Sequence, residues 1–143
     1  MAQNSKSSWL LNLLIVVTLI VVSLAFMAHY KNWTKIENNS FRIFSGIYYQ
    51  KIPFSEMDSL TMVPKIPSME RINGFSVKEI EKGVFKEDSI GETKVHVFVD
   101  KLSHSKIRMV YNDSLKMYFN LSDSTATKAL YDYLSSKINV EKE

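Results

Sequence analysis

A continuous run of apolar residues near the N-terminus dominates the hydrophobic pattern of the chain. Residues 9–28 (WLLNLLIVVTLIVVSLAFMA) contain no charge, no Gly and no Pro. At about 1.5 Å per residue, a helix of this length reaches across the hydrocarbon core of a bilayer, which is about 30 Å thick. A helix satisfies its own backbone hydrogen bonds and can therefore lie in lipid. The pattern predicts a transmembrane helix over residues 9–28, preceded by a polar tail, residues 1–8.

Aromatic and basic residues bracket this run. Trp9, Tyr30 and Trp33 suit the membrane–water interface, and Lys31 supplies a charged stop, so we expect these four residues to act as interface anchors. Two alternatives stay open. A cleaved signal peptide could use Ser23-Leu24-Ala25 as its cleavage site, but the apolar run is longer than a usual signal core. A buried core helix is disfavoured because apolar residues occupy every face.

Basic residues are nearly balanced on the two sides of the run, so the positive-inside rule gives no firm orientation. A short polar tail followed by one apolar helix is typical of an uncleaved signal-anchor, which places the larger part of the chain outside the cytoplasm. We therefore expect a single-pass membrane protein with a weak preference for an extracytoplasmic C-terminal domain. The side on which this domain lies stays open.

The pattern changes to alternation with period two beyond residues 29–39, which we interpret as a polar connector or a first strand. Seven short runs with strand character follow, at residues 40–45, 47–52, 59–63, 80–85, 93–99, 107–111 and 115–119. Asn73-Gly74 predicts a tight turn. Gly83 predicts a bulge or a close approach of two backbones.

The last two runs share one apolar phase around Asn112-Asp113-Ser114, which predicts a hairpin of fixed register. The period then changes to that of a helix, predicted at about residues 123–138 with Ser122 or Asp123 as its N-cap and a fraying tail, residues 139–143. The expected apolar stripe of this helix consists of Ala126, Leu130, Tyr133, Leu134 and Ile138.

These elements predict a mainly β fold. Seven short strands avoid open edges if they close into a small bent barrel or sandwich, with the C-terminal helix covering one open end. This domain takes residues 40–138.

Several short motifs then occur in an order that is typical of one family. They are Ile52-Pro53-Phe54-Ser55-Glu56, Arg71-Ile72-Asn73-Gly74, Gly83-Val84-Phe85, and Asn120 followed by Asp123, Thr125 and Leu130-Tyr131. On these motifs, residues 36–137 resemble the bacterial pleckstrin-homology-like (PH-like) family. The resemblance implies a bent, seven-stranded β-barrel capped by a C-terminal helix and, with the predicted span, a bacterial inner-membrane protein. It implies no single activity, because PH-like domains bind lipids, bind peptides or act as scaffolds.

One connection departs from the lipid-binding members of that family. Relatives that recognise phosphoinositides hold the headgroup in a long basic loop between their first two strands. Here the connection is only Ser45-Gly46, flanked by Arg42 and Lys51. Isolated basic residues cannot surround several phosphates, so we do not expect specific inositol-phosphate recognition.

Composition narrows the possible chemistry further. The chain has no Cys, which excludes a disulfide, a thiolate nucleophile and a cysteine-ligated metal. His29, His96 and His104 lie in unrelated segments, so we expect no metal site, and we place His96 on the outer face of its strand. No phosphate-binding or dinucleotide motif is present, and we expect no cofactor. The net charge of +3 and the lack of a matching motif argue against nucleic-acid binding.

Two groups of polar residues have the composition of catalytic sites. Ser103-His104-Ser105 and Asp100 contain the residue types of a triad, but their segment is typical of a turn. Glu79, Glu81 and Glu87 could supply paired carboxylates, yet Lys78 and Lys82 flank the first two, which favours a solvated charged edge. We therefore expect a protein that is not an enzyme.

Two surfaces remain as candidates for binding. The first, for a protein or peptide partner, consists of Arg71, Asn73, Tyr48 and Phe75. The second, a basic outer face for anionic lipid, consists of Lys101, Lys106, Arg108 and Lys116. Local packing and ordinary solubility are the competing explanations. We expect a membrane-anchored module that holds a protein or peptide partner beside an exposed strand and the C-terminal helix. Sensing of anionic lipid or a small ligand is the alternative, and the partner and the oligomeric state stay open.

Overall fold

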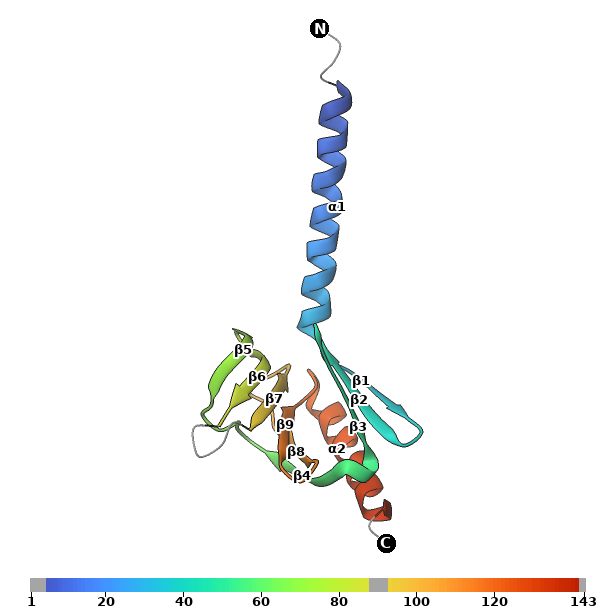
Figure 1. The fold of residues 1–143 in the computed structure, drawn as a ribbon, viewed down its shortest axis with the longest axis vertical. Helices are drawn as coiled ribbons and strands as arrows, with labels where there is room; N and C mark the ends of the chain where they lie inside the picture. Colours follow the sequence, from blue (N-terminus) through green and yellow to red (C-terminus); the bar gives the residue numbers. More distant parts are fainter. Residues whose placement is uncertain (1–4, 88–92, 142–143) are drawn as a thin grey trace.

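The computed structural model describes residues 5–87 and 93–141, and Figure 1 shows a long helix standing on a β-rich domain. This helix, α1 (Ser5–Tyr30), extends past both ends of the predicted span. Its segment Ser8–Tyr30 is long and apolar enough to cross a membrane, and none of its apolar window is buried inside the structure. α1 is thus a candidate membrane span or signal sequence, and the alternative of a buried core helix is wrong.

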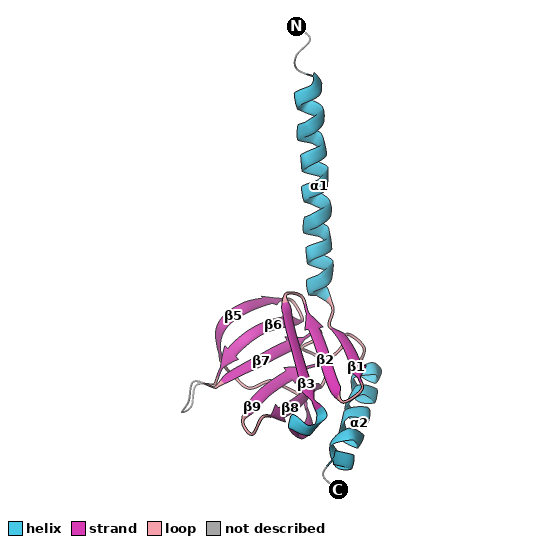
Figure 2. Ribbon diagram, turned by 45° about the vertical axis from the view of Figure 1, so that its right-hand side comes forward, coloured by secondary structure: helices cyan, strands magenta, loops and turns pink. Residues whose placement is uncertain are grey.

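The described residues below α1 contain nine strands in two sheets (Figure 2). The first sheet is antiparallel with the order β1-β2-β3, formed by β1 (Trp33–Glu37), β2 (Ser40–Ser45) and β3 (Tyr48–Pro53). A 3-10 turn, η1 (Phe54–Glu56), leads to the second sheet, whose order is β4-β8-β9-β7-β6-β5. Its strands are β4 (Met57–Val63), β5 (Glu70–Val77), β6 (Ile80–Lys86), β7 (Lys94–Val99), β8 (Lys106–Tyr111) and β9 (Leu115–Phe119). The last described element is α2 (Ser124–Glu141).

The mainly β architecture and the C-terminal helix are confirmed, but the count of seven strands is wrong. The two strands beyond that count are β1, which lies in the segment interpreted as connector or first strand, and β5. β5 contains Asn73-Gly74, so the predicted tight turn is absent there, and the chain turns instead at Lys78, whose φ is +54°. β5 has no buried residue, which explains why its hydrophobic alternation is weak.

Gly74 and Gly83 explain why an apparent turn motif lies inside a strand. The two glycines face each other across β5 and β6 and have φ of +126° and +152°. A Cβ on Gly83 would overlap the Asn73 carbonyl oxygen and lie 2.7 Å from the Gly74 Cα. The close backbone approach predicted at Gly83 is therefore confirmed, and Gly is required on both strands.

The C-terminal hairpin is confirmed in detail. β8 and β9 pair with Met109 opposite Met117 and Ile107 opposite Phe119. Asn112 and Asp113 have φ of +49° and +66°, as a tight hairpin turn requires. β9 also pairs in parallel with β7, so the segment between β7 and β8 crosses the end of β9.

The main core lies between the two sheets and α2. Its buried members are Phe41, Ile43, Ile52, Phe54, Met57, Phe98, Ile107, Met109, Tyr111, Met117, Phe119, Leu134 and Ile138. A second, smaller cluster on the other face of the large sheet consists of Phe85, Val95, Val97, Val99 and Tyr118. Ile66 and Met69, in the connection between β4 and β5, cover this second cluster. Both faces of the large sheet are thus packed.

The start of α2 is fixed by Asp123, whose Oδ1 accepts a hydrogen bond from the Ala126 amide at 2.9 Å. This confirms Asp123 as the N-cap, and the bonds from the Ala126 and Thr125 amides lower the pKa of its carboxyl. The predicted stripe is only partly right. Leu134 and Ile138 are buried and Leu130 packs against the core, whereas Ala126 and Tyr133 are exposed. The helix also continues past Ile138 to Glu141.

Candidate functional site

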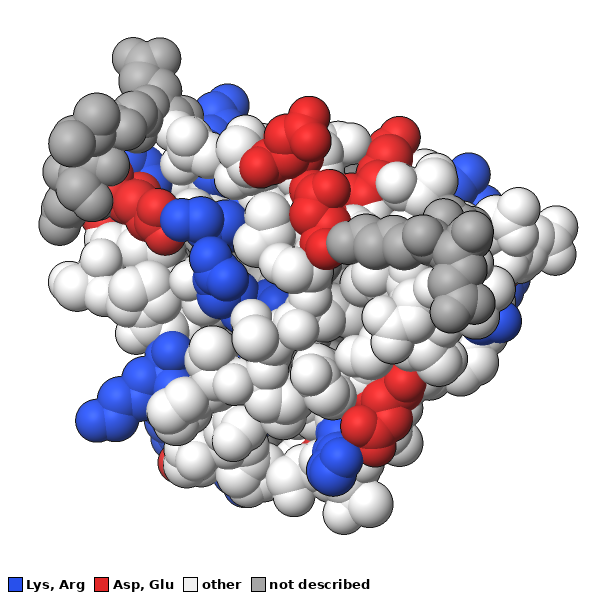
Figure 3. Space-filling model, turned by 90° about the horizontal axis from the view of Figure 1, so that it is seen from below, with Lys and Arg blue, Asp and Glu red and all other residues white. Residues whose placement is uncertain are grey.

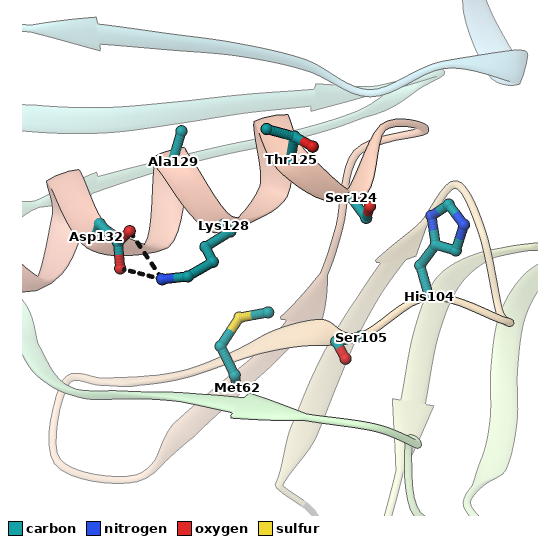
Figure 4. A pocket seen from close by; sticks show the side chains of 8 residues that line it. All are labelled: Met62, His104, Ser105, Ser124, Thr125, Lys128, Ala129 and Asp132. Carbon is teal, nitrogen blue, oxygen red and sulfur yellow. Dashed lines mark hydrogen bonds and ion pairs between the residues drawn. The ribbon is translucent and has the colours of Figure 1, made fainter.

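A groove runs between the first half of α2 and the β4–β8 edge of the large sheet (Figure 4). Its volume is about 660 Å³. The lining residues are Met62, His104 and Ser105 on the sheet side, and Ser124, Thr125, Lys128, Ala129 and Asp132 on α2. Met62 points toward the helix across the floor of the groove, and Lys128 and Asp132 form an ion pair of 3.0 Å on the helix wall.

The sheet side of this groove ends in an open strand edge. β4 is the terminal strand of the six-stranded order and pairs only with β8 among the described strands. Ser59 and Thr61 are exposed, while Leu60 and Met62 pack against the core beneath α2. One side of the β4 backbone is thus unpaired among the described strands, and α2 lies over the face of β4 that carries Leu60 and Met62.

Packing holds α2 at this distance from β4. The Thr127 side chain is buried and its Oγ1 accepts a hydrogen bond of 3.0 Å from the Leu121 amide. Further along, Leu134 and Ile138 are seated in the core with Phe54 of η1. The exposed residues Lys128 and Ala129 are therefore presented to the groove by a helix that is fixed at both ends.

A second cluster of polar groups lies where α1 meets the domain, and we call it the junction cluster: Asn32, Lys82, Asp100, Asn120 and Ser122. Lys82 Nζ lies 2.9 Å from Asp100 Oδ1, and both side chains are almost completely buried. The backbone N–H of Asn32 donates to both Asp100 carboxylate oxygens, at 2.9 and 3.0 Å. Burial lowers the pKa of the Lys82 ammonium, and the Asp100 carboxylate opposes this effect.

The side-chain amides of Asn120 and Asn32 complete the junction cluster. Asn120 Oδ1 accepts from the Asp100 and Lys101 amides, and its Nδ2 donates to the Lys101 and Ser105 carbonyls. Asn32 Nδ2 donates to the Phe98 and Asn120 carbonyls at 2.6 and 2.8 Å. Asn32, which lies just after the end of α1, is therefore hydrogen-bonded to the centre of the large sheet.

The expectation of a solvated charged edge is wrong for Lys82, which is fully buried. Glu79 does lie at the surface, where it accepts from the Ser103 hydroxyl at 2.5 Å. Asp100 is bonded to Lys82 and Asn32, and Ser103 to Glu79, so these groups are engaged in structural contacts rather than in a triad with His104. No three His, Asp or Glu side chains in residues 5–87 and 93–141 form a cluster that could hold a metal ion.

Of the four residues predicted to contact a partner, Tyr48 and Asn73 contact each other, whereas Arg71 and Phe75 contact residues outside this set. The Tyr48 hydroxyl donates to Asn73 Oδ1 at 3.0 Å. The Arg71 guanidinium lies 5.9 Å from the centre of the Phe85 ring and donates to the Ser76 hydroxyl. Phe75 packs edge-on against His29 at the foot of α1. They lie on β3 and β5 and none of them lines the groove beside α2.

The residues predicted as a basic lipid face do not form an exposed basic surface. Lys106 is buried, and its Nζ donates to the Pro64 carbonyl at 2.9 Å and to the Leu102 carbonyl. Lys116 is ion-paired with Glu87 at 2.7 Å. Arg108 is half-buried on β8 and Lys101 lies in the connection that follows β7. Lys106 thus adds no exposed charge to this face, and the other three basic residues are only partly exposed.

Aromatic residues at both ends of α1 are exposed, as interface anchors require. Trp9 is 65% exposed, Tyr30 71% and Trp33 64%. Lys31 is also exposed, directly below the helix. Trp33 begins β1, so its ring belongs to the small sheet as well as to the region around the helix end.

The sequence predicts that His96 lies on the outer face of its strand, and this prediction is wrong. His96 lies half-buried between the sheets, with Nε2 at 3.1 Å from Gln50 Nε2 and Nδ1 at 3.3 Å from the Tyr111 hydroxyl. Burial, assisted by the charge of Lys94, lowers the pKa of His96 below its usual 6.5. The folded domain therefore favours the neutral imidazole.

This lowered pKa predicts a pH dependence of stability. The unfolded chain binds the His96 proton more readily, so the contribution is complete above pH 6.5 and is lost as the pH falls toward the folded-state pKa. We expect the free energy of unfolding to decrease between about pH 7 and pH 5, and His96→Gln to make this slope shallower. Denaturant unfolding of the full chain in detergent, followed by circular dichroism, measures both slopes. Equal slopes in the two proteins would show that His96 is not responsible.

Comparisons with known proteins add no relative for this chain. No family model, no curated protein and no solved structure matches it. Function must therefore be argued from the groove, the junction cluster and the surface of the domain.

Proposed function

We propose that this protein is a non-catalytic, membrane-anchored binding module that holds an extended segment of a partner protein in the groove between β4 and α2. The unpaired backbone edge of β4, next to a groove that α2 also lines, is the observation that carries this proposal. An extended peptide can add a strand to such an edge, and the side chains along the groove then select its sequence.

The groove lining suggests the chemistry of that segment. Met62 and Ala129 supply apolar surface from opposite sides, which suits a small or medium apolar side chain. Lys128 and Asp132 form an exposed ion pair at the rim, where polar groups of the partner can exchange with them. A short peptide with an apolar anchor between polar residues matches this arrangement.

The anchor in this proposal is α1. Its exposed apolar surface has no partner in the described domain, and lipid is the environment that such a helix requires. The length of the apolar run favours retention over cleavage, so the mature chain keeps α1. A mature N-terminus located after Ala25 would contradict this part of the proposal.

We further propose that the domain lies outside the cytoplasm of a bacterial inner membrane, on the signal-anchor pattern and the PH-like resemblance. The chain has no Cys, so Ser55→Cys at an exposed position creates a single thiol. We expect a membrane-impermeant maleimide to label this thiol in intact cells. Labelling only after the cells are lysed would place the domain in the cytoplasm.

Membership of the PH-like family is also a proposal. Two sheets, a C-terminal helix and the mid-domain glycines support it. The nine described strands and the parallel pairing of β7 with β9 depart from the seven-stranded barrel that the resemblance implies. The groove does not depend on this identity, because it follows from an open edge beside a helix.

Ala129→Arg tests the groove. Ala129 is exposed and lines the groove, so a long cationic side chain fills the site without disturbing the core. We expect peptides selected from a displayed random library on the full chain in nanodiscs to bind this variant at least tenfold more weakly. Fluorescence anisotropy with a labelled selected peptide measures the affinity.

Asn139→Arg is the matched control. Asn139 is exposed on the same helix but does not line the groove, and the substitution adds the same side chain and charge. Affinity should stay within about twofold of the unmodified chain. Equal weakening by both variants, or by neither, would overturn the assignment of the groove.

A further inference from the structure

The outer face of the small sheet carries two rows of side chains with different chemistry. Strand register places Trp33, Phe44 and Tyr49 opposite one another, and next to them Lys35, Arg42 and Lys51. We call these the aromatic row and the basic row. The rings of Phe44 and Tyr49 lie 4.7 Å apart, and all three aromatic residues are more than 40% exposed. The opposite face of this sheet packs its Phe41, Ile43 and Ile52 into the core.

The aromatic row is the one nearer to α1. Trp33 lies three residues after Tyr30 in the sequence. The turn between β2 and β3 also lies against the end of the helix, so closely that a Cβ on Gly46 would overlap the His29 ring. Ile47 in this turn is 79% exposed. Figure 1 shows the three strands running obliquely away from the foot of α1, so the basic row lies further from the helix. Two residues along a strand separate the rows by about 7 Å.

The basic row keeps a positive charge despite one acidic neighbour. Glu37 pairs with Lys35 and with Arg42 at 2.6 Å each. The hydrogen bond from Lys35 and the charge of Arg42 lower the pKa of Glu37, which therefore stays ionised at neutral pH. Three basic side chains and one carboxylate leave an excess of positive charge on this part of the face. On the side of the domain opposite α1, Lys, Arg, Asp and Glu are interspersed (Figure 3).

We propose that this face is a second membrane contact, in which the aromatic row and Ile47 enter the headgroup region and the basic row binds anionic lipid headgroups. Aromatic rings favour the interface, and basic residues within a Debye length of an anionic surface are attracted to it. Each basic residue strengthens such an attraction about fivefold. The inference rests on α1 spanning the bilayer and is independent of the groove.

The junction cluster makes this contact specific in orientation. Asn32 is bonded to the large sheet through Asp100, Phe98 and Asn120, and His29 packs against Phe75 and the Gly46 turn. The domain is therefore held at a fixed angle to α1. With the small sheet against the bilayer, the groove between β4 and α2 is presented at a constant height and direction to a partner.

A tryptophan introduced in place of Tyr49 tests the contact, because Tyr49 is remote from α1 along the chain. The native chain has two Trp residues, so Tyr49→Trp in a Trp9→Phe, Trp33→Phe background is a single-Trp protein. We expect brominated lipids with shallow bromines to quench the introduced tryptophan in nanodiscs that contain about 30% phosphatidylglycerol. Quenching should fall at least twofold in zwitterionic nanodiscs or in 0.5 M NaCl, because salt screens the attraction.

The charge requirement is tested with matched variants. Lys35→Gln, Arg42→Gln and Lys51→Gln together should reduce the quenching at least twofold. The control replaces Lys65, Lys86 and Lys94 by Gln, which removes the same number of charges elsewhere, and should leave quenching unchanged. Absence of quenching of the introduced tryptophan, or quenching that is indifferent to lipid charge and to the basic row, would overturn the proposal.

The anchor is tested separately in the Trp33→Phe variant, which retains only Trp9. Quenching of Trp9 by brominated lipid shows that α1 is in the bilayer. Quenching of Trp9 without quenching of the tryptophan introduced by Tyr49→Trp would refute the second contact and leave the anchor intact. Loss of quenching in both proteins would refute the membrane anchor itself, and with it this inference.

Discussion

Replacing Asp100 by Ala is expected to destabilise the domain by about 3–5 kcal/mol, as is typical when one partner of a buried ion pair is removed. The substitution leaves the Lys82 ammonium, whose side chain is fully buried, without its counter-ion. It also removes the carboxylate that accepts hydrogen bonds from the backbone N–H of Asn32 and from the Ser122 hydroxyl. The loss is large because the remaining charge cannot reach water.

Denaturant unfolding of the full chain in detergent, followed by circular dichroism of the β-structure, measures this loss. Glu70→Ala is the control, because Glu70 pairs with Lys86 at the surface, and it should cost less than about 1 kcal/mol. Removing both charges, with Lys82→Met and Asp100→Leu, should recover much of the stability lost in Asp100→Ala. Equal costs for Asp100→Ala and Glu70→Ala would show that the buried pair does not stabilise the junction cluster.

Gly83→Ala is expected to cost at least about 2 kcal/mol, because it combines a strained backbone conformation with overpacking. The φ of +152° is rarely adopted by residues with a side chain, and the new Cβ would overlap the Asn73 carbonyl oxygen on β5. β5 must then move away from β6, which also disturbs the neighbouring Lys82.

The same unfolding experiment measures this effect, with Ser59→Ala as control. Ser59 is exposed on β4, so its replacement should change stability by no more than about 0.5 kcal/mol. A Gly83→Ala variant as stable as Ser59→Ala would mean that the two strands do not approach as closely as the structure shows.

Elements with a clear hydrophobic period could be predicted from the sequence. The apolar run of α1, the β8–β9 hairpin and the helix beginning after Asp123 each follow from local patterns. In the hairpin, Met109 pairs with Met117 because both strands place their apolar residues on one face. Such patterns depend on neighbours along the chain, so a single sequence contains them.

The missed features depend on contacts between distant segments. β5 has no buried residue, so no apolar alternation marks it as a strand. Asn73-Gly74 has the sequence of a turn, but it lies inside β5, where Gly74 pairs closely with Gly83 of β6. Lys82 can be buried because Asp100, in the connection after β7, supplies the opposite charge that its ammonium group needs. The position of Lys82 two residues after the buried Ile80 was the available signal that its side chain points inward.

The candidate surfaces show the same limit. The predicted basic face consists of residues that are near one another in sequence, and one of them, Lys106, is buried. The basic row instead joins Lys35, Arg42 and Lys51 from three strands, and only the register of the small sheet brings them together. The groove likewise combines β4 with a helix that follows it much later in the chain.

Hydrogen exchange of the β4 backbone amides tests whether the edge of β4 accepts a strand from a partner. In the free full chain in nanodiscs, we expect those amides of residues 59–63 that point away from β8 to exchange rapidly, because no described strand covers them. With a selected peptide bound, these amides should become protected at least tenfold, while those of β5 stay unchanged. Outer-edge amides of β4 that are already protected in the free chain, or that stay unprotected when the peptide is bound, would contradict strand addition in the groove.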